Sequence, residues 1–170
     1  VFASSSGSFA LYSDAEWEPP TGCGVRKTPW APWELPSISK GLGAILFAPN
    51  VSCKAWATQC PDAWVCKLSP RAPQIIPLEL IALIAAIHIN ISTISNNRVL
   101  FLVDNLAVAS MLTTGSTTMS DLLNIVIGTH YLLAKHKVKW WVEWTPSKSN
   151  PADVPSRSGR TPLCATEHLT

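Results

Sequence analysis

The chain has 170 residues, of which 47% are hydrophobic and 14% charged, and this balance excludes an intrinsically disordered protein. The length fits one domain that is able to bury a core, so we expect a single domain over residues 1–170. The formal net charge of +2 is too small to indicate a nucleic-acid partner by itself.

Several features favour an intracellular protein. Five cysteines, an odd number, match no zinc-binding spacing and fit a reducing compartment. The start of the chain lacks the basic residues and the long apolar stretch of a secretory signal. The apolar segment from Ile75 to Ile91 contains Pro77, Glu79 and His88, and is short for a membrane span. We therefore expect a cytoplasmic or nuclear protein without a membrane partner.

The first part of the chain predicts three strands and one insertion. Phe9 to Asp14 is apolar up to its last residue and fits a central strand. Residues 16–39 contain five prolines and three tryptophans without a helix or strand period, and predict an insertion. Lys40 to Ala48 and Ser52 to Gln59 predict two strands that complete a meander. Trp64 to Leu68 is either an edge strand or a segment that lies across the sheet.

The second part of the chain predicts three helices and two strands. Proline suits the first turn of the first helix, and an uninterrupted apolar run fits a buried parallel strand. Gly115 can end the second helix in the left-handed conformation, and Ser120 can cap the third. The helices are expected at about Pro77–Asn90, Leu106–Thr114 and Asp121–His136, and the strands at Val99–Val103 and Val138–Trp144. A meander followed by helix-connected strands indicates an α/β protein with a mixed sheet.

Four acidic residues, Asp14, Glu79, Asp104 and Asp153, lie in or beside stretches where an isolated carboxylate is unfavourable. Burying one costs several kcal/mol unless a cation or hydrogen bonds compensate. Several carboxylates brought together repel one another, and some take up protons. A pair of divalent metal ions would remove both problems, so the pattern indicates a metal-dependent enzyme acting on phosphate esters. The rest of the surface is then expected to be basic, which suits a polyanionic partner.

Five short pieces of sequence occur in order along the chain, each on a predicted strand or helix or directly after one. They are Tyr12-Ser-Asp-Ala15, Lys40-Gly-Leu-Gly-Ala44, Pro77-Leu-Glu-Leu-Ile-Ala82, Val103-Asp-Asn105 with Ala107, and Trp144-Thr-Pro-Ser-Lys-Ser-Asn-Pro-Ala-Asp-Val-Pro-Ser-Arg157. In these pieces the chain resembles the ribonuclease H domain that follows the polymerase in retroelement reverse transcriptases. The resemblance covers a core at about 9–157 and leaves a tail at 158–170. The last piece most resembles eukaryotic retrotransposons, including the tyrosine-recombinase class.

The resemblance implies a ribonuclease H-like fold: a mixed five-stranded sheet, an antiparallel meander followed by parallel strands, with helices on both faces. It also implies cleavage of the RNA strand of RNA–DNA hybrids, selected by duplex shape and 2′-hydroxyl contacts rather than base sequence. The implied partners are the RNA–DNA hybrid and the polymerase domain of the same polyprotein.

The resemblance further implies a role for each of the four acids. Asp14 would bridge two Mg²⁺ ions, Asp153 would complete the ion that activates the attacking water, and Glu79 with Asp104 would hold the other. Two ions about 3.5–4 Å apart stabilise the attacking and the leaving oxygen of a displacement at phosphorus. Mg²⁺ suits carboxylate ligands, and Mn²⁺ is a possible substitute.

Two departures from the family affect these expectations. Lys148 stands where cellular ribonucleases H carry a mobile histidine; a lysine can bind a phosphate or the product but is a poor proton shuttle at neutral pH. Lys148 and Asn105 are the expected substrate-binding residues. Pro155 and Gly159 leave room for only a short final helix behind Asp153.

Two other functions compete with this interpretation. An integrase or transposase would need its glutamate on a helix, but Glu143 lies in an alternating strand beside three tryptophans, so we reject it. The second alternative is a catalytically silent ribonuclease H-like module that binds nucleic acid or a partner domain. The intact set of four acids argues against that alternative.

Overall fold

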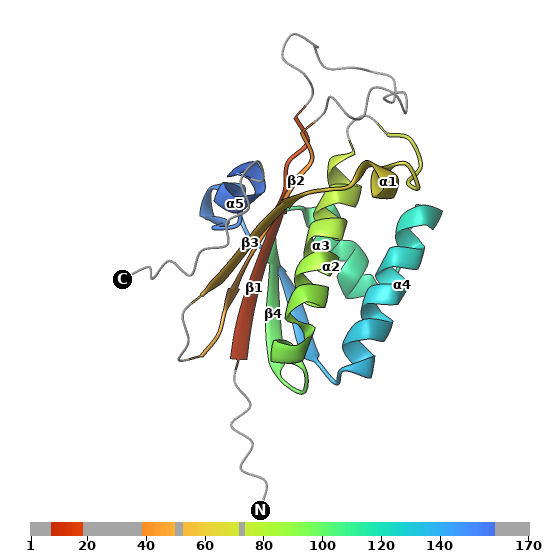
Figure 1. Cartoon of the computed structure of the whole chain (residues 1–170). Helices are drawn as coiled ribbons and strands as arrows, with labels where there is room; N and C mark the ends of the chain where they lie inside the picture. The colour runs from red at the N-terminus through yellow and green to blue at the C-terminus, as the bar shows by residue number, and fades with distance from the viewer. Residues whose placement is uncertain (1–7, 19–38, 50–52, 72–73, 159–170) are drawn as a thin grey trace, which may run out of the picture.

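A computed structural model describes residues 8–18, 39–49, 53–71 and 74–158 of the protein (Figure 1). Most of the expected insertion and of the expected tail lies outside these residues, as does the start of the expected strand at Ser52. Within the described part the chain folds around one five-stranded sheet with helices on its two faces.

The sheet has the strand order β3-β2-β1-β4-β5. Its first three strands form an antiparallel meander, and β4 and β5 add to β1 in parallel. Each parallel step is a crossover through helices, as such connections require. The predicted mixed five-stranded sheet is therefore confirmed. The strands are β1 Ser8–Ala15, β2 Gly41–Phe47, β3 Lys54–Gln59, β4 Arg98–Val103 and β5 Lys139–Trp144.

The longer helices cover one face of the sheet, and a short last helix lies on the other face (Figure 1). The short last helix fits the expectation drawn from Pro155. The predicted bounds of α3 are confirmed, and Gly115 ends this helix with a positive φ of 65°. The helices are α1 Asp62–Val65, α2 Ile75–Ile94, α3 Leu106–Thr114, α4 Ser120–Lys135 and α5 Asp153–Ser158.

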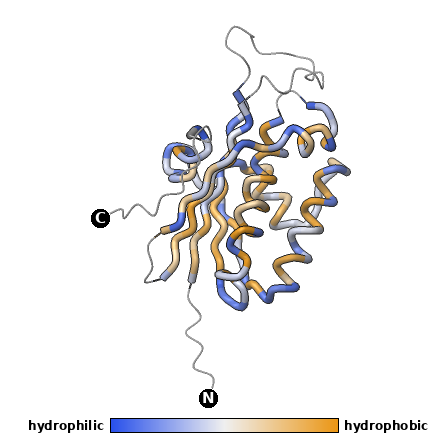
Figure 2. The backbone as a smooth tube through the Cα atoms, viewed as in Figure 1, coloured by the Kyte–Doolittle hydropathy of each residue, from blue (hydrophilic) through white to orange (hydrophobic). Residues whose placement is uncertain are grey.

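The central helix α2 is longer than predicted, with 20 residues. By length and composition it is long and apolar enough to cross a membrane, so the argument that this segment is too short for a span is wrong. More than half of the span is buried inside the domain, between the sheet, α3 and α4. Figure 2 shows hydrophobic residues along most of its length. A helix that packs against the sheet on one side and against other helices on another needs little polar surface, which accounts for its composition.

Two local expectations differ from the structure. Of the two alternatives for Trp64 to Leu68, the edge strand is wrong, because the amides of this segment bond to carbonyls three or four residues earlier, beginning at Pro61. Those amides are used within the turn and cannot pair with a sheet edge. Ser120 is the first residue of α4 and not its cap, a place that Met119 takes without a side-chain bond.

Candidate metal centre

Three of the four singled-out acids meet at one edge of the sheet. Asp14 lies near the end of β1, and Asp104 directly follows β4, the parallel neighbour of β1. Glu79, in the second turn of α2, reaches the same edge from above the sheet. One carboxylate oxygen from each of these residues lies within 4.8 Å of the other two. Parallel strands end at a common edge, and this brings together residues 90 positions apart in sequence.

Burial and mutual repulsion shift the titration of these groups. Asp14 and Glu79 are each 4% exposed. Burial, opposed in part by a hydrogen bond from Ser156 and reinforced by the charges of Asp104 and Asp153, raises the pKa of Asp14 to about 7. Burial, followed by the charges of Asp14 and Asp104, raises the pKa of Glu79 well above its ordinary value. Both carboxylates therefore favour a proton or another cation at neutral pH.

Two oxygens of this group lack a hydrogen-bond donor. Within the described residues, Oε2 of Glu79 and Oδ1 of Asp104 are buried and accept no hydrogen bond. A buried acceptor without a partner is costly, and native structures rarely leave one unexplained. Converging carboxylate oxygens are the ligands that hard divalent cations prefer. The residues present therefore fit a divalent metal ion.

The three carboxylates line a cavity of about 360 Å³ whose lining is strongly acidic. Among the described residues, Arg157 is the single lysine or arginine of this lining. Six of the nine acidic residues that the structure describes lie here, which leaves three acidic residues against nine lysines and arginines in the rest of the described part. Negative charge is thus concentrated where a cation would bind, and the remaining sequence is basic. The acidic lining residues are Asp14, Glu16, Glu18, Glu79, Asp104 and Asp153.

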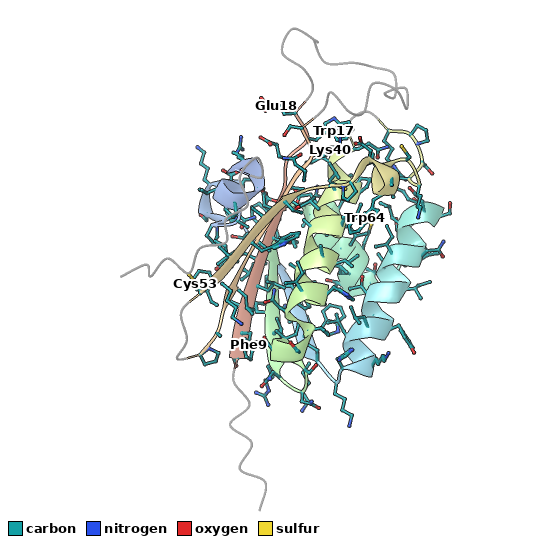
Figure 3. The ribbon with its side chains drawn as sticks, viewed as in Figure 1. Phe9, Trp17, Glu18, Lys40, Cys53 and Trp64 are labelled. Atoms are coloured by element: carbon teal, nitrogen blue, oxygen red, sulfur yellow. The ribbon has the colours of Figure 1, made fainter. Side chains whose placement is uncertain are left out.

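Glu16 and Glu18 were expected in the insertion, but they continue the pairing of β1 with β2. The amide of Glu16 donates to the carbonyl of Gly41 at 2.8 Å, and Glu18 forms a bridge with Ser39. Figure 3 shows Trp17 and Glu18 at this end of the strand pair, with Phe9 at the other. The pairing of β1 with β2 thus extends to residue 18, two residues past the approximate start expected for the insertion.

Asp153 lines the same cavity but is not one of the three clustered acids. It is the first residue of α5, and Arg157, one turn later, contacts its Oδ1 through Nε at 2.9 Å and Nη2 at 2.8 Å. The pair is solvent-exposed, where ion pairs contribute little to stability. The structure thus brings Asp153 to the cavity with one oxygen engaged by a cation of the chain itself.

No protein-family model matches the chain, and no curated protein does. Solved structures do match. Ribonuclease H1 from the halophilic archaeon Halobacterium salinarum superposes with a TM-score of 0.62 over 90% of this chain and 97% of its own, at 17% sequence identity. The chain has the ribonuclease H fold.

Two further structures with the ribonuclease H fold extend the comparison. LC11 ribonuclease H1, solved in complex with an RNA/DNA hybrid, has a TM-score of 0.62 and 11% identity, covering 88% of this chain and 94% of its own. Prototype foamy virus protease-reverse transcriptase has a TM-score of 0.52 and 15% identity. That match covers 91% of this chain and 20% of the viral protein, so the fold forms one segment of a longer polypeptide there.

One expected substrate-binding residue, Asn105, directly follows Asp104, and the other, Lys148, lies one residue after Ser147 of the cavity lining. The side-chain oxygen of Asn105 accepts hydrogen bonds from the amides of Ala107 at 3.0 Å and Val108 at 3.4 Å, and so caps α3. Lys148 is exposed in the short helix η2, Ser147–Ser149, whose first residue lines the cavity. Their contact with a substrate stays a prediction.

Sequence reasoning assigned no role to two buried polar residues that shape this edge of the fold. Asn150 bonds to the backbone of β1, and Ser156 bonds to Asp14. Both lie inside the last matching piece of sequence. An asparagine and a serine are common surface residues, so their type alone gave no reason to single them out. Their burial, 4% and 0% exposed, is what reveals them.

A larger cavity of about 840 Å³ lies between α2 and α4. Its lining is mostly apolar, with Trp56, Trp64 and Ile84 among the residues. Its one carboxylate, Asp121, is held by Arg71 in an ion pair. Size alone would favour this cavity, but it offers no set of groups for catalysis or metal binding. The candidate centre therefore lies in the smaller, acidic cavity.

Proposed function

We propose that this protein is a ribonuclease H, which hydrolyses the RNA strand of RNA–DNA hybrids in a divalent-metal-dependent reaction. The observation that carries the proposal is the convergence of Asp14, Glu79 and Asp104, with two buried oxygens that lack donors. On a ribonuclease H fold this group lies at the ends of β1 and β4, beside the first residue of α5.

In this proposal Asp14, Glu79 and Asp104 hold the metal, and Asp153 completes the set from α5. Two bound Mg²⁺ ions, for which Mn²⁺ can substitute, would supply an activated water and neutralise charge on the phosphate. Ionised carboxylates in this lining repel a phosphodiester, so the cavity without a bound cation disfavours the substrate. Cation binding is then a precondition for substrate binding. Lys148, exposed beside the cavity, would contact a phosphate of the hybrid.

We further propose that the domain works inside a retrotransposon reverse transcriptase, with the polymerase domain of the same polyprotein as its partner. The support is the Asn-Pro-Ala-Asp piece ending at Asp153 and the likeness to one segment of the foamy virus protein. An intracellular site of action follows from that role.

The test uses a hybrid with 5′-labelled RNA, incubated with the purified protein in Mg²⁺ or Mn²⁺. We expect RNA fragments with 5′-phosphate and 3′-hydroxyl ends, no cutting of the DNA strand, and no cutting of single-stranded or double-stranded RNA. Asp104→Asn, which removes a charge and keeps the shape, should abolish cleavage. Circular dichroism checks that this variant is folded. A folded wild-type protein that cuts no hybrid in either metal would overturn the proposal.

One observation favours the second candidate, a silent module that binds nucleic acid or a partner domain. Arg157 holds one oxygen of Asp153 in an ion pair. If that pair persists with Mg²⁺ present, the protein binds the hybrid without cutting it. Hybrid binding by wild type and by Asp104→Asn would then be equal, whereas the nuclease requires weaker metal-dependent binding by the variant.

A further inference from the structure

Ser156 makes the closest polar contact at the candidate centre. Its side chain is fully buried, and its hydroxyl donates a hydrogen bond to Oδ2 of Asp14. The same hydroxyl lies 2.8 Å from the backbone carbonyl of Asp153. When Asp14 is ionised, as in a metal-bound site, its carboxylate is a stronger acceptor than a carbonyl, and the single hydrogen of the hydroxyl is directed at Asp14. Ser156 thus links α5 to β1 at the acid that the proposed function places between two metal ions.

Two glycines allow Ser156 to reach Asp14. Gly43 pairs directly with Asp14 in the β1–β2 ladder, so both point to the face that carries α5. A Cβ atom on Gly43 would lie 2.3 Å from the amide nitrogen of Ser156, and one on Gly41 would lie 1.8 Å from its carbonyl oxygen. The space that two side chains would fill is therefore occupied by the backbone of α5. This close approach fixes the serine hydroxyl against the carboxylate.

We infer that Ser156 is a positioning residue for divalent-cation binding: by holding one oxygen of Asp14, it fixes the orientation of that carboxylate toward the oxygens of Glu79 and Asp104. This inference rests on the proposed metal-dependent function. Groups that hydrogen-bond to a metal ligand set its orientation, and their loss typically weakens metal affinity or activity by about 10–100-fold. The cation concerned is a hard divalent ion such as Mg²⁺ or Mn²⁺.

A purely structural role for Ser156 predicts different behaviour. If its hydroxyl served only to attach α5, its removal would lower the stability of the metal-free protein and leave the affinity for metal unchanged. If it orients Asp14, its removal weakens metal binding whatever happens to the metal-free stability. Metal affinity, measured apart from catalysis, distinguishes the two roles.

The experiment measures Mn²⁺ binding by isothermal titration calorimetry, and the rise in Tm between EDTA and a series of Mn²⁺ concentrations. We expect Ser156→Ala to bind Mn²⁺ at least about 10-fold more weakly than wild type, with a smaller metal-induced rise in Tm. Ser156→Cys keeps the shape with a weaker donor and serves if the alanine variant does not fold. Ser156→Thr keeps the hydroxyl and should restore most of the affinity. Ser149→Ala, at an exposed serine of η2, is the matched control and should match wild type.

The outcomes distinguish failure of the proposed function from failure of this inference. A wild-type protein with no Mn²⁺ response overturns the proposed metal-dependent function, and this inference with it. A normal wild-type response together with unchanged affinity in Ser156→Ala and Ser156→Cys overturns the inference alone. In the hydrolysis assay, the loss in Ser156→Ala should be large at limiting Mg²⁺ and recover as Mg²⁺ rises. A loss that saturating Mg²⁺ does not reduce contradicts a positioning role.

Discussion

The side-chain amide of Asn150 donates a hydrogen bond to the carbonyl oxygen of Ser13, 2.9 Å away. This bond joins the loop before α5 to β1 at the residue next to Asp14. The other end of the same amide group accepts from the backbone of Ala152 at 3.1 Å. Asn150 therefore sets where α5 begins relative to the first strand.

Replacing Asn150 with aspartate should destabilise the protein. The change keeps the acceptor for Ala152 but removes the donor, and it places a carboxylate oxygen against the carbonyl of Ser13. A buried acceptor left without a donor costs about 1–3 kcal/mol in free energy of unfolding, which urea titration measures. Asn124→Asp, at an exposed position of α4, is the control and should stay within about 0.5 kcal/mol of wild type. Equal losses in the two variants would contradict the anchoring role.

Gly43→Ala and Gly128→Ala should change stability in opposite directions. At Gly43 the added methyl meets the backbone of α5, which must move, and overpacking of this kind costs about 1–3 kcal/mol. Gly128 lies in α4 with no atom within 4 Å of the added methyl, so alanine should stabilise the helix by about 0.5–1 kcal/mol. The free energy of unfolding in urea measures both. Tolerance of alanine at residue 43 would mean that α5 does not lie tightly on β2.

Without divalent ions, the protein should lose stability as pH rises from about 4 to about 8. The pKa of Asp14 is raised to about 7 and that of Glu79 is raised well above its ordinary value. The folded protein therefore keeps protons that the unfolded chain has already released. Their contribution is complete below the ordinary carboxyl pKa and is lost as pH rises through the folded-state values. For one such proton, the free energy of unfolding falls by up to about 1.4 kcal/mol per pH unit.

The free energy of unfolding in EDTA across this pH range tests that expectation. Glu79→Gln removes one of the two titrating groups, so it should flatten the slope and be more stable than wild type at the alkaline end. Added Mg²⁺ should flatten the slope of the wild type, because the metal replaces the lost protons. Parallel curves for wild type and Glu79→Gln would show that Glu79 does not hold a proton in the folded state.

Lys148→Ala should weaken binding of the hybrid in a salt-dependent way. A lysine that contacts one phosphate contributes about 0.9 to the magnitude of the slope of log affinity against log salt concentration. The slope of the variant should therefore be smaller in magnitude by about 0.9. KM for the hybrid, measured over a series of salt concentrations, reports the change. Lys54→Ala, an exposed position at the end of β3 away from the cavity, provides the comparison. An equal effect at both lysines would assign the change to overall charge.

The sequence predicted the elements whose signals are local. The apolar run at β4 and the glycine at the end of α3 need no distant partner to be interpreted, and both predictions are confirmed. The convergence of Asp14 with Asp104 also follows from the order of elements, since parallel strands end at one edge. Local pattern and topology were sufficient for this part of the fold.

Features that depend on distant partners could not be predicted in this way. Asp121 belongs to an ion pair with Arg71, 50 positions away, which lowers the pKa of the Asp121 carboxyl to about 2. Asp62 at the start of α1 forms an ion pair with buried Lys40, 22 positions earlier, a contact that depends on the pairing of distant segments.

The separation of Asp14 and Ser156 by 142 positions has a consequence for biosynthesis. Within the described core, the strand that carries Asp14 is translated before every other element, and the helix that packs on Gly41 and Gly43 is translated last. Until Ser156 has been translated, the cavity lined by Asp14, Glu79 and Asp104 lacks one of its walls. The cavity can therefore be completed only after α5 has been translated. A polypeptide truncated before Ser156 cannot form the complete cavity.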